Sequence, residues 1–212
     1  MKTVQLICST ILLLITSTAA VAAKPIAESA EVVSPLLPGQ KVPSVQATDL
    51  NNKPVDLAQI VNGKPTVLFF YRGGWCPFCN TQMGQLQAIE KDLKDLGFQL
   101  IGISTDNIAD LNKSISDREL SYQLLSDYNS QVSQAFGLAF FTSQKVTDRY
   151  LAKMDLKNPL QKNAAGVERL VLPAPAVYVI DSKGLVQFQY VNPNFRTRLA
   201  PELLLHAAKL AK

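Results

Sequence analysis

The sequence predicts an α/β protein in which a central mixed sheet lies between two layers of helices. In the middle of the chain, apolar runs of strand length alternate with segments whose apolar residues recur every three or four positions. Two strand-like segments joined by Asp181-Ser182-Lys183-Gly184 then predict a hairpin, which a last helical segment follows. A chain of 212 residues with 47% hydrophobic residues is long enough for one domain with a substantial core.

In the first half of the domain, expected strands and helices alternate regularly. Thr66 to Tyr71 is a continuous apolar run, as expected for a strand buried on both faces. A helix is expected from about Cys76 to Leu96, and Phe98 to Ser104 is a second buried strand. Asp106 is expected to cap a second helix, whose apolar face is formed by Ile108, Leu111 and Ile115.

The second half departs from this alternation. A segment at about 139–174, called the insertion below, interrupts it and should lie near the reactive cysteines described below, because it directly precedes Pro175. The elements expected here are a strand at Tyr122 to Leu125, a short helix at Val132 to Phe136, a helix at Thr142 to Leu156 inside the insertion, the hairpin strands Ala176 to Ile180 and Leu185 to Val191, and a helix at Pro201 to Ala211.

The N-terminus predicts export. Residues 1–23 combine a basic start, a short apolar run and an Ala-x-Ala-like end, which is typical of a secretory signal peptide cleaved near Ala22 or Ala23. The apolar run is too short for a membrane anchor, so we expect a periplasmic or secreted protein without stable membrane insertion. Residues 24–43 contain four prolines and are expected to form an extended arm before the domain at 44–212.

Charge excludes one class of partner. The net charge is +4 and falls to +3 when Lys2 leaves with the signal peptide. The basic residues are scattered, without a Lys/Arg cluster or interleaved aromatic residues. We therefore expect no nucleic-acid binding.

Cysteine usage points to redox chemistry. Cys8 lies in the signal peptide, so the mature chain keeps Cys76 and Cys79, which are too close in sequence to staple a domain. A zinc site would need four ligands, and the mature chain offers only His206 besides the two cysteines. We expect neither a metal nor a cofactor.

The motif Tyr71-Arg72-Gly73-Gly74-Trp75-Cys76-Pro77-Phe78-Cys79 stands where a buried strand ends and a helix begins. Free N–H groups and the helix dipole stabilise a thiolate at this position, and Pro77 suits the first helical turn. The pKa of Cys76 is therefore expected to be lowered. Cys79, one turn further, is the natural resolving thiol.

Three neighbours of the cysteines are candidate site residues. Arg72 would add a cation beside Cys76 if it folds back; as an exposed cation it would contribute little to stability, and the alternative is an ordinary surface residue. Trp75 and Phe78 would form an apolar collar that holds a substrate. For Trp75, ordinary core packing is the alternative.

These residues resemble the alkyl hydroperoxide reductase/thiol-specific antioxidant family of the thioredoxin superfamily, in its peroxiredoxin-like branch with a Cys-x-x-Cys motif. The resemblance covers about residues 36–211 and is carried by Phe70-Tyr71-Arg72-Gly73-Gly74-Trp75-Cys76-Pro77-Phe78-Cys79, Leu172 to Asp181 and Asn192 to Glu202. It implies a thioredoxin-like three-layer fold and Cys76 as the peroxidatic thiol. It also implies a cis-proline that packs against the active disulfide, at Pro175 or, as the competing candidate, Pro173.

The sequence departs from the pattern of ordinary peroxiredoxins at three places. Phe69 and Gly73 stand where those proteins carry Pro and Thr or Ser, so the hydroxyl that orients peroxide is missing. Their second arginine is replaced by the Pro175 region, with Arg169 six residues earlier. Arg72 is then the one well-placed cation, which makes the site less complete than that of a dedicated peroxidase.

We therefore expect a thiol-dependent antioxidant oxidoreductase that reduces hydroperoxides through the Cys76–Cys79 dithiol and receives electrons from a thioredoxin-like or other thiol reductant. The main alternative is a thiol-disulfide exchange protein that acts on exported proteins.

Overall fold

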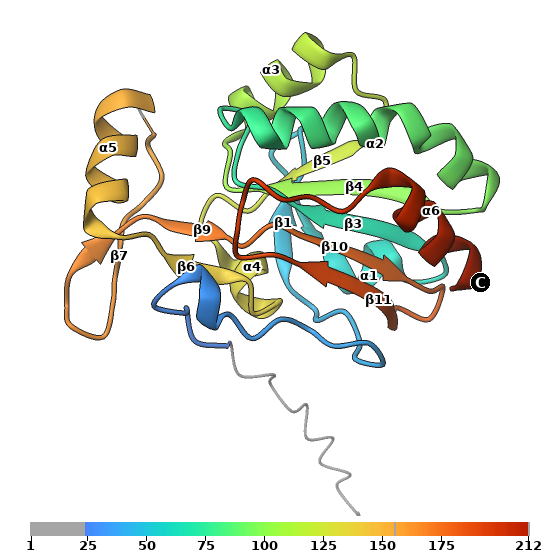
Figure 1. Ribbon diagram of the computed structural model, residues 1–212, viewed down its shortest axis with the longest axis horizontal. Coiled ribbons are helices and arrows are strands. Elements are labelled where there is room, and N and C mark those ends of the chain that lie inside the picture. Colours follow the sequence, from blue (N-terminus) through green and yellow to red (C-terminus); the bar gives the residue numbers. More distant parts are fainter. Residues whose placement is uncertain (1–23, 155, 212) are drawn as a thin grey trace, which may run out of the picture.

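A seven-stranded mixed sheet forms the centre of the computed structural model, which describes residues 24–154 and 156–211 (Figure 1). The strand order is β11-β10-β3-β4-β5-β1-β2. The strands are β1 (Gln46–Thr48), β2 (Pro54–Asp56), β3 (Thr66–Phe70), β4 (Gln99–Ser104), β5 (Gln123–Ser126), β10 (Ala176–Ile180) and β11 (Val186–Val191).

Strand direction follows from the connections. β3, β4 and β5 are parallel, because the helices α2 (Pro77–Asp95) and α3 (Ile108–Arg118) cross over between them. β10 is antiparallel to β3, with Ala176 opposite Phe70 and Ile180 opposite Thr66. β10 and β11 form the expected hairpin, whose turn is held by the Asp181 carboxylate accepting from the amides of Lys183 and Leu185. The predicted mixed sheet is confirmed.

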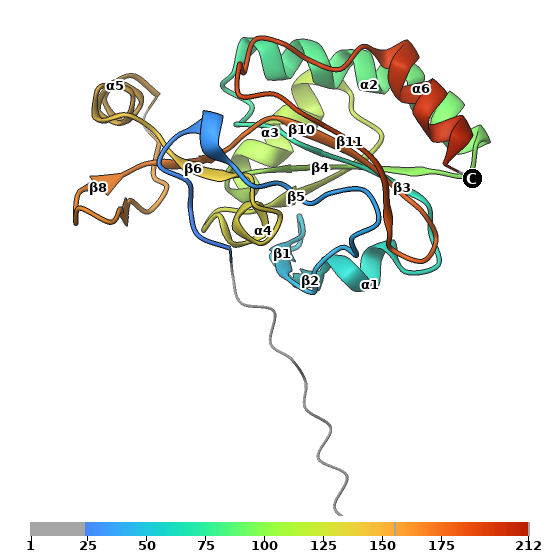
Figure 2. The same cartoon turned by 60° about the horizontal axis from the view of Figure 1, so that its bottom comes forward.

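Alternate residues of the buried strands face two separate cores. Val67 and Phe69 of β3 pack toward α2, α3 and α6 (Pro201–Leu210), whereas Leu68 and Phe70 pack toward α1 (Leu57–Val61) and α4 (Gln131–Ala135). Figure 2 shows these two helical layers on opposite faces of the sheet. Because both faces are covered, β3 is buried throughout and apolar from Val67 to Phe70, as expected for a central strand.

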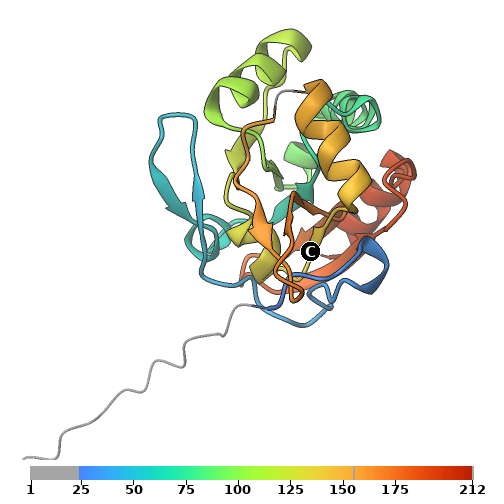
Figure 3. The same ribbon diagram turned by 90° about the vertical axis from the view of Figure 1, so that its left-hand side faces the viewer.

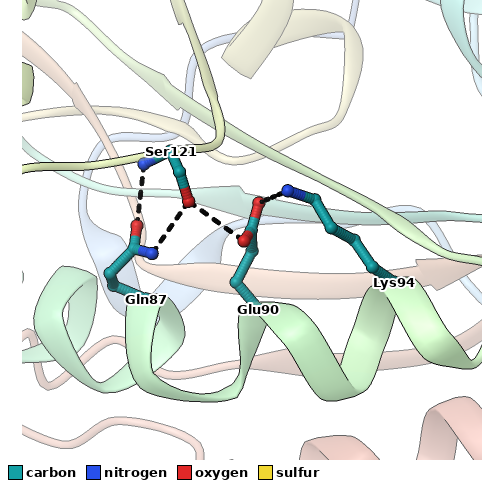
Figure 4. A network of polar contacts seen from close by, with 4 residues as sticks. All are labelled: Gln87, Glu90, Lys94 and Ser121. Carbon is teal, nitrogen blue, oxygen red and sulfur yellow. Dashed lines mark hydrogen bonds and ion pairs between the residues drawn. The ribbon is translucent and has the colours of Figure 1, made fainter.

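A polar network fixes α2 to the chain that enters β5 (Figure 4). The buried carboxylate of Glu90 accepts a hydrogen bond from Ser121 Oγ and forms an ion pair with Lys94. The side-chain amide of Gln87 donates to Ser121 Oγ, and its oxygen accepts from the Ser121 amide. The network holds the helix that carries both reactive cysteines against the sheet.

The insertion forms a small substructure at one end of the sheet (Figures 1 and 3). It begins with β6 (Ala139–Phe141), which pairs with β9 (Val171–Pro173) and so brings both ends of the insertion together. Between them lie α5 (Gln144–Met154) and the short pair β7 (Gln161–Lys162) and β8 (Glu168–Arg169). The predicted helix in the insertion is thus present.

The N-terminal arm, residues 24–43, follows the body of the domain. It contains one short 3₁₀ helix, η1 (Ala30–Val32), and forms bridges from Ala27 to Phe140 and from Lys41 to Leu185. The predicted signal peptide lies outside the described residues. Within residues 24–154 and 156–211, no helix is both long enough and apolar enough to cross a membrane.

Two local expectations were incomplete or wrong. The hairpin of β1 and β2 and the helix α1 are too short to produce a clear hydrophobic period, so the sequence did not reveal them. Asn107 rather than Asp106 caps α3, because its side chain accepts from the amide of Asp110. Asp106 points instead into the loop before Cys76.

Candidate active site

Cys76 is the N-cap residue of α2 and follows β3 through a tight loop. Its amide donates to the carbonyl of Gly73, and Pro77 occupies the start of the helix, where no donor is lost. The carbonyl of Cys76 accepts from the amides of Cys79 and Asn80. The structure therefore presents the Cys76 sulfur at the positive end of the helix dipole.

The two cysteines are buried free thiols with opposite pKa shifts. A hydrogen bond from the Cys79 thiol, helped by the Cys79 amide and by Arg72 and Arg198, lowers the pKa of Cys76 to about 6 despite burial. Burial, together with the hydrogen bond to Cys76, raises the pKa of Cys79 well above its ordinary value. The arrangement makes Cys76 the nucleophile and leaves the proton on Cys79.

Arg72 lies inside the protein and not on its surface. It is 4% exposed, and its guanidinium lies 4.3 Å from the ring centroid of Phe195, with the rings of Tyr150 and Trp75 also within cation–π range. Its Nη2 donates to the hydroxyl of Tyr150 at 3.0 Å. The expectation of an exposed cation is wrong, because the insertion and the chain after β11 close over the guanidinium.

The insertion reaches the site through aromatic contacts. Tyr150 of α5 is buried and meets Trp75 edge to face, with ring centroids 5.0 Å apart. Trp75 packs against both the core under α2 and the small core of the insertion. Trp75 therefore packs in the core and also lies within cation–π range of Arg72.

Gly73 has no room for a side chain. Its φ of +151° disfavours other residues, and a Cβ there would lie 2.2 Å from Trp75 Nε1 and 2.6 Å from Asp106 Oδ1. The neighbouring Gly74 amide donates to Asp106 Oδ2 at 2.8 Å, and Ser104 Oγ donates to the same oxygen. The loop geometry thus explains why no Thr or Ser hydroxyl stands three residues before Cys76.

Phe78 forms the outer side of the site. Its side chain is 40% exposed and meets Phe195 edge to face at 5.7 Å, while Arg196 stacks on Phe78 from outside. Phe195 links this exposed ring to the buried Arg72. Two aromatic rings therefore lead from solvent toward Arg72.

Pro175 lies beside the site, but not with the geometry that the resemblance implied. No peptide bond in residues 24–154 or 156–211 is cis, so neither Pro175 nor Pro173 supplies a cis-proline. At this point the Ala174 amide donates to the carbonyl of Leu138, and the carbonyl of Pro175 accepts from the Asn192 amide. Pro175 is buried and lines a cavity together with Arg72.

Arg198 is a functional candidate that the sequence analysis missed. Its Nη2 donates to Cys79 Sγ at 3.4 Å, and its charge lowers the pKa of both cysteines. The signal in the sequence was its position in the family-like segment Asn192 to Glu202.

A mixed sheet between helical layers, with a dithiol at the start of the first crossover helix, defines a protein of the thioredoxin-like fold class. The sequence model of the AhpC/TSA family matches residues 38–189, and the chain belongs to this family.

Curated relatives agree with this assignment. Peroxiredoxin Bcp of Escherichia coli K12 is 30% identical over 106 residues, which are 50% of this chain and 67% of that protein. Chloroplastic peroxiredoxin Q of Triticum aestivum is 29% identical over 154 residues, 73% of this chain and 58% of that protein.

Two crystal structures share the fold. Reduced Prx3 from Vibrio vulnificus has a TM-score of 0.65 and 17% identity, covering 82% of this chain and 99% of that chain. Peroxidoxin BcpB from Mycobacterium tuberculosis has a TM-score of 0.62 and 20% identity, covering 82% and 97%. The thioredoxin-like fold predicted from the sequence is confirmed.

Proposed function

We propose that this protein is a thiol-dependent peroxidase that reduces hydroperoxides through Cys76 and Cys79. The observation that carries the proposal is the dithiol at the start of α2, where a hydrogen bond from the Cys79 thiol, helped by the charges of Arg72 and Arg198, lowers the pKa of Cys76 to about 6. At neutral pH, Cys76 is then mainly thiolate, the form that attacks peroxide. The relatives named as peroxiredoxins support the same activity.

In the first step, the Cys76 thiolate attacks the terminal oxygen of a hydroperoxide. An S–O bond forms and the O–O bond breaks, so the sulfur is oxidised to a sulfenic acid and the peroxide is reduced to an alkoxide, or hydroxide from H₂O₂. A proton converts this leaving group to the alcohol or water. Arg72 stabilises the charge that develops on oxygen, and the Tyr150 hydroxyl beside it offers a proton in place of the hydroxyl that Gly73 lacks.

In the second step, Cys79 resolves the sulfenic acid. Its thiolate attacks Cys76 Sγ, an S–S bond forms, the S–O bond breaks, and hydroxide leaves as water after protonation. Arg198 contacts Cys79 Sγ and favours the thiolate that this step needs. An external dithiol, thioredoxin-like or of another kind, then reduces the disulfide by thiol–disulfide exchange.

We also propose that the protein works after export. The N-terminal pattern of residues 1–23 supports a cleaved signal peptide, and an oxidising compartment suits a disulfide-forming dithiol. Cell fractionation with N-terminal sequencing should find the mature chain outside the cytoplasm, beginning near residue 23 or 24. A cytoplasmic protein that keeps Met1 would contradict export.

The experiment that tests the activity uses Cys79→Ser, which removes the resolving thiol with little change in volume. Hydrogen peroxide should convert Cys76 to a persistent sulfenic acid, visible by mass spectrometry as one added oxygen and then over-oxidation. Cys76→Ser is the matched control and should gain no such oxygen.

The alternative function, thiol–disulfide exchange with exported proteins, predicts instead that Cys79→Ser collects mixed disulfides on non-reducing gels. Abundant mixed disulfides with sluggish peroxide oxidation would refute the peroxidase.

A further inference from the structure

A cavity of about 320 Å³ lies between the N-terminal arm, the insertion and the chain after β11. Its apolar walls include Phe140, Val146 and Phe195, and the buried Arg72 also lines it. Two arginines of the insertion, Arg149 and Arg169, also line it. Pockets of this size and mixed character are typical of sites for small organic ligands.

The arginines of this cavity have no carboxylate partner in the part of the chain that the structure describes. Among the described residues, the ion pairs are all made by lysines, and none involves Arg72, Arg149 or Arg169. The Nε atoms of Arg72 and Arg169 are buried without a hydrogen-bond acceptor. A buried, unpaired guanidinium N–H is costly, so both groups are poised for an anionic acceptor.

The acidic residues at the cavity do not cancel this charge. Glu28 and Glu31 line it, but both are exposed, and Glu28 accepts a hydrogen bond from Asn163. Arg149 is exposed as well, so the cations held inside the cavity are Arg72, which is buried, and Arg169, which is half-buried. The charge of Arg72 also acts on Cys76, whose pKa it helps to lower.

We propose that this cavity binds a small organic anion that has one carboxylate and a flat apolar body. Arg169 holds the carboxylate, because its guanidinium has no competing partner among the described residues, whereas Arg72 already donates to Tyr150. The apolar body packs against Phe195 and Phe140. Because the bound charge lies in the field of Arg72, binding raises the pKa of Cys76 and slows its reactions at neutral pH.

The test uses benzoate as the probe and the fluorescence of Trp75, the single tryptophan, as the signal, since its ring meets Tyr150 at the cavity. Benzoate should change the emission saturably, and the uncharged isostere benzamide should not. Arg169→Gln should weaken benzoate binding about tenfold, and Arg169→Lys should restore part of it. Lys162→Gln is the matched control: it removes an exposed cation from the neighbouring β7 and should leave binding unchanged.

A second measurement follows Cys76 directly. Saturating benzoate should move the midpoint pH of Cys76 alkylation by iodoacetamide upward in the parent and Lys162→Gln proteins. No saturable signal, equal binding of benzamide, unchanged affinity in a folded Arg169→Gln protein, or equal competition by inorganic phosphate at matched ionic strength would overturn the proposal. None of these readouts needs peroxide turnover, so failure of the proposed peroxidase would be seen separately.

Discussion

The guanidinium of Arg198 donates a hydrogen bond to the sulfur of Cys79, although 119 residues separate them in the chain. Cys79 is fully buried, and burial raises its pKa well above the ordinary value, so its thiolate is rare in the reduced protein. The contact with Arg198 opposes this effect. Arg198 therefore assists the step in which Cys79 must attack.

We predict that Arg198→Gln slows disulfide formation after peroxide addition by about tenfold, because a charge-assisted contact to the resolving thiolate is lost. Attack by Cys76 should slow much less. Stopped-flow oxidation followed by acid quench and mass spectrometry would show a longer-lived sulfenic acid. Lys209→Gln, an exposed change in the nearby α6, is the control and should behave like the parent. Equal lifetimes in both variants would exclude this role for Arg198.

The thiol of Cys79 should be the main source of the low pKa of Cys76. Cys79→Ala removes the hydrogen-bond donor and should move the pKa of Cys76 up toward the free-cysteine value of about 8.5. Cys79→Ser keeps a donor and should retain most of the shift. The rate of iodoacetamide alkylation against pH reports both values. Equal midpoints in the two variants would show that the helix terminus and the arginines, not Cys79, control the thiolate.

Arg72→Ala should affect both reactivity and stability, because the side chain is buried against three aromatic rings. We expect the free energy of unfolding to fall by about 1–3 kcal/mol. The new cavity and the lost cation–π contacts destabilise the protein more than removal of a buried charge stabilises it. The alkylation midpoint of Cys76 should rise as well. Urea unfolding and alkylation measure the two effects. An unchanged unfolding midpoint would mean that the aromatic contacts contribute nothing net.

Tyr150→Phe removes the hydroxyl that accepts from Arg72 while the ring stays against Trp75. If this hydroxyl serves the peroxide, the rate of Cys76 oxidation by hydrogen peroxide should fall by about tenfold or more. The rate of alkylation by iodoacetamide should change little, because that reaction needs no proton donor. A parallel loss in both rates would indicate that the hydroxyl acts only through the Cys76 thiolate.

Asp106 should make stability depend on pH. Burial raises its pKa to about 6, so between about pH 4 and pH 6 the folded state binds more protons than the unfolded state. The contribution of Asp106 to the free energy of unfolding is complete below pH 4. It falls by about 2–3 kcal/mol as the pH rises through 6. Asp106→Asn should remove this contribution relative to the parent, which urea unfolding across pH 4–7 would show. Parallel pH profiles of the two proteins would disprove the shift.

Much of the fold could be predicted because its main elements carry local signals. The apolar run of β3 and the helical period of α2 are readable from neighbouring residues alone, and together they locate Cys76 at a helix start. The hairpin β1–β2 escaped because three-residue strands show no period. The cis-proline was wrong because it came from resemblance alone, whereas no peptide bond in the described residues is cis.

The sequence by itself determined the order of the main strands and helices from β3 onward, the dithiol and the position of Cys76 at the helix dipole, because each depends on residues close together in the chain. Only the tertiary structure decided what surrounds the thiols. Tyr150 reaches Arg72 across 78 residues, Asp106 reaches Gly74 across 32, and Arg198 reaches Cys79 across 119. Such contacts depend on how the insertion and the chain after β11 pack over the sheet, and no local spacing or periodicity encodes that packing.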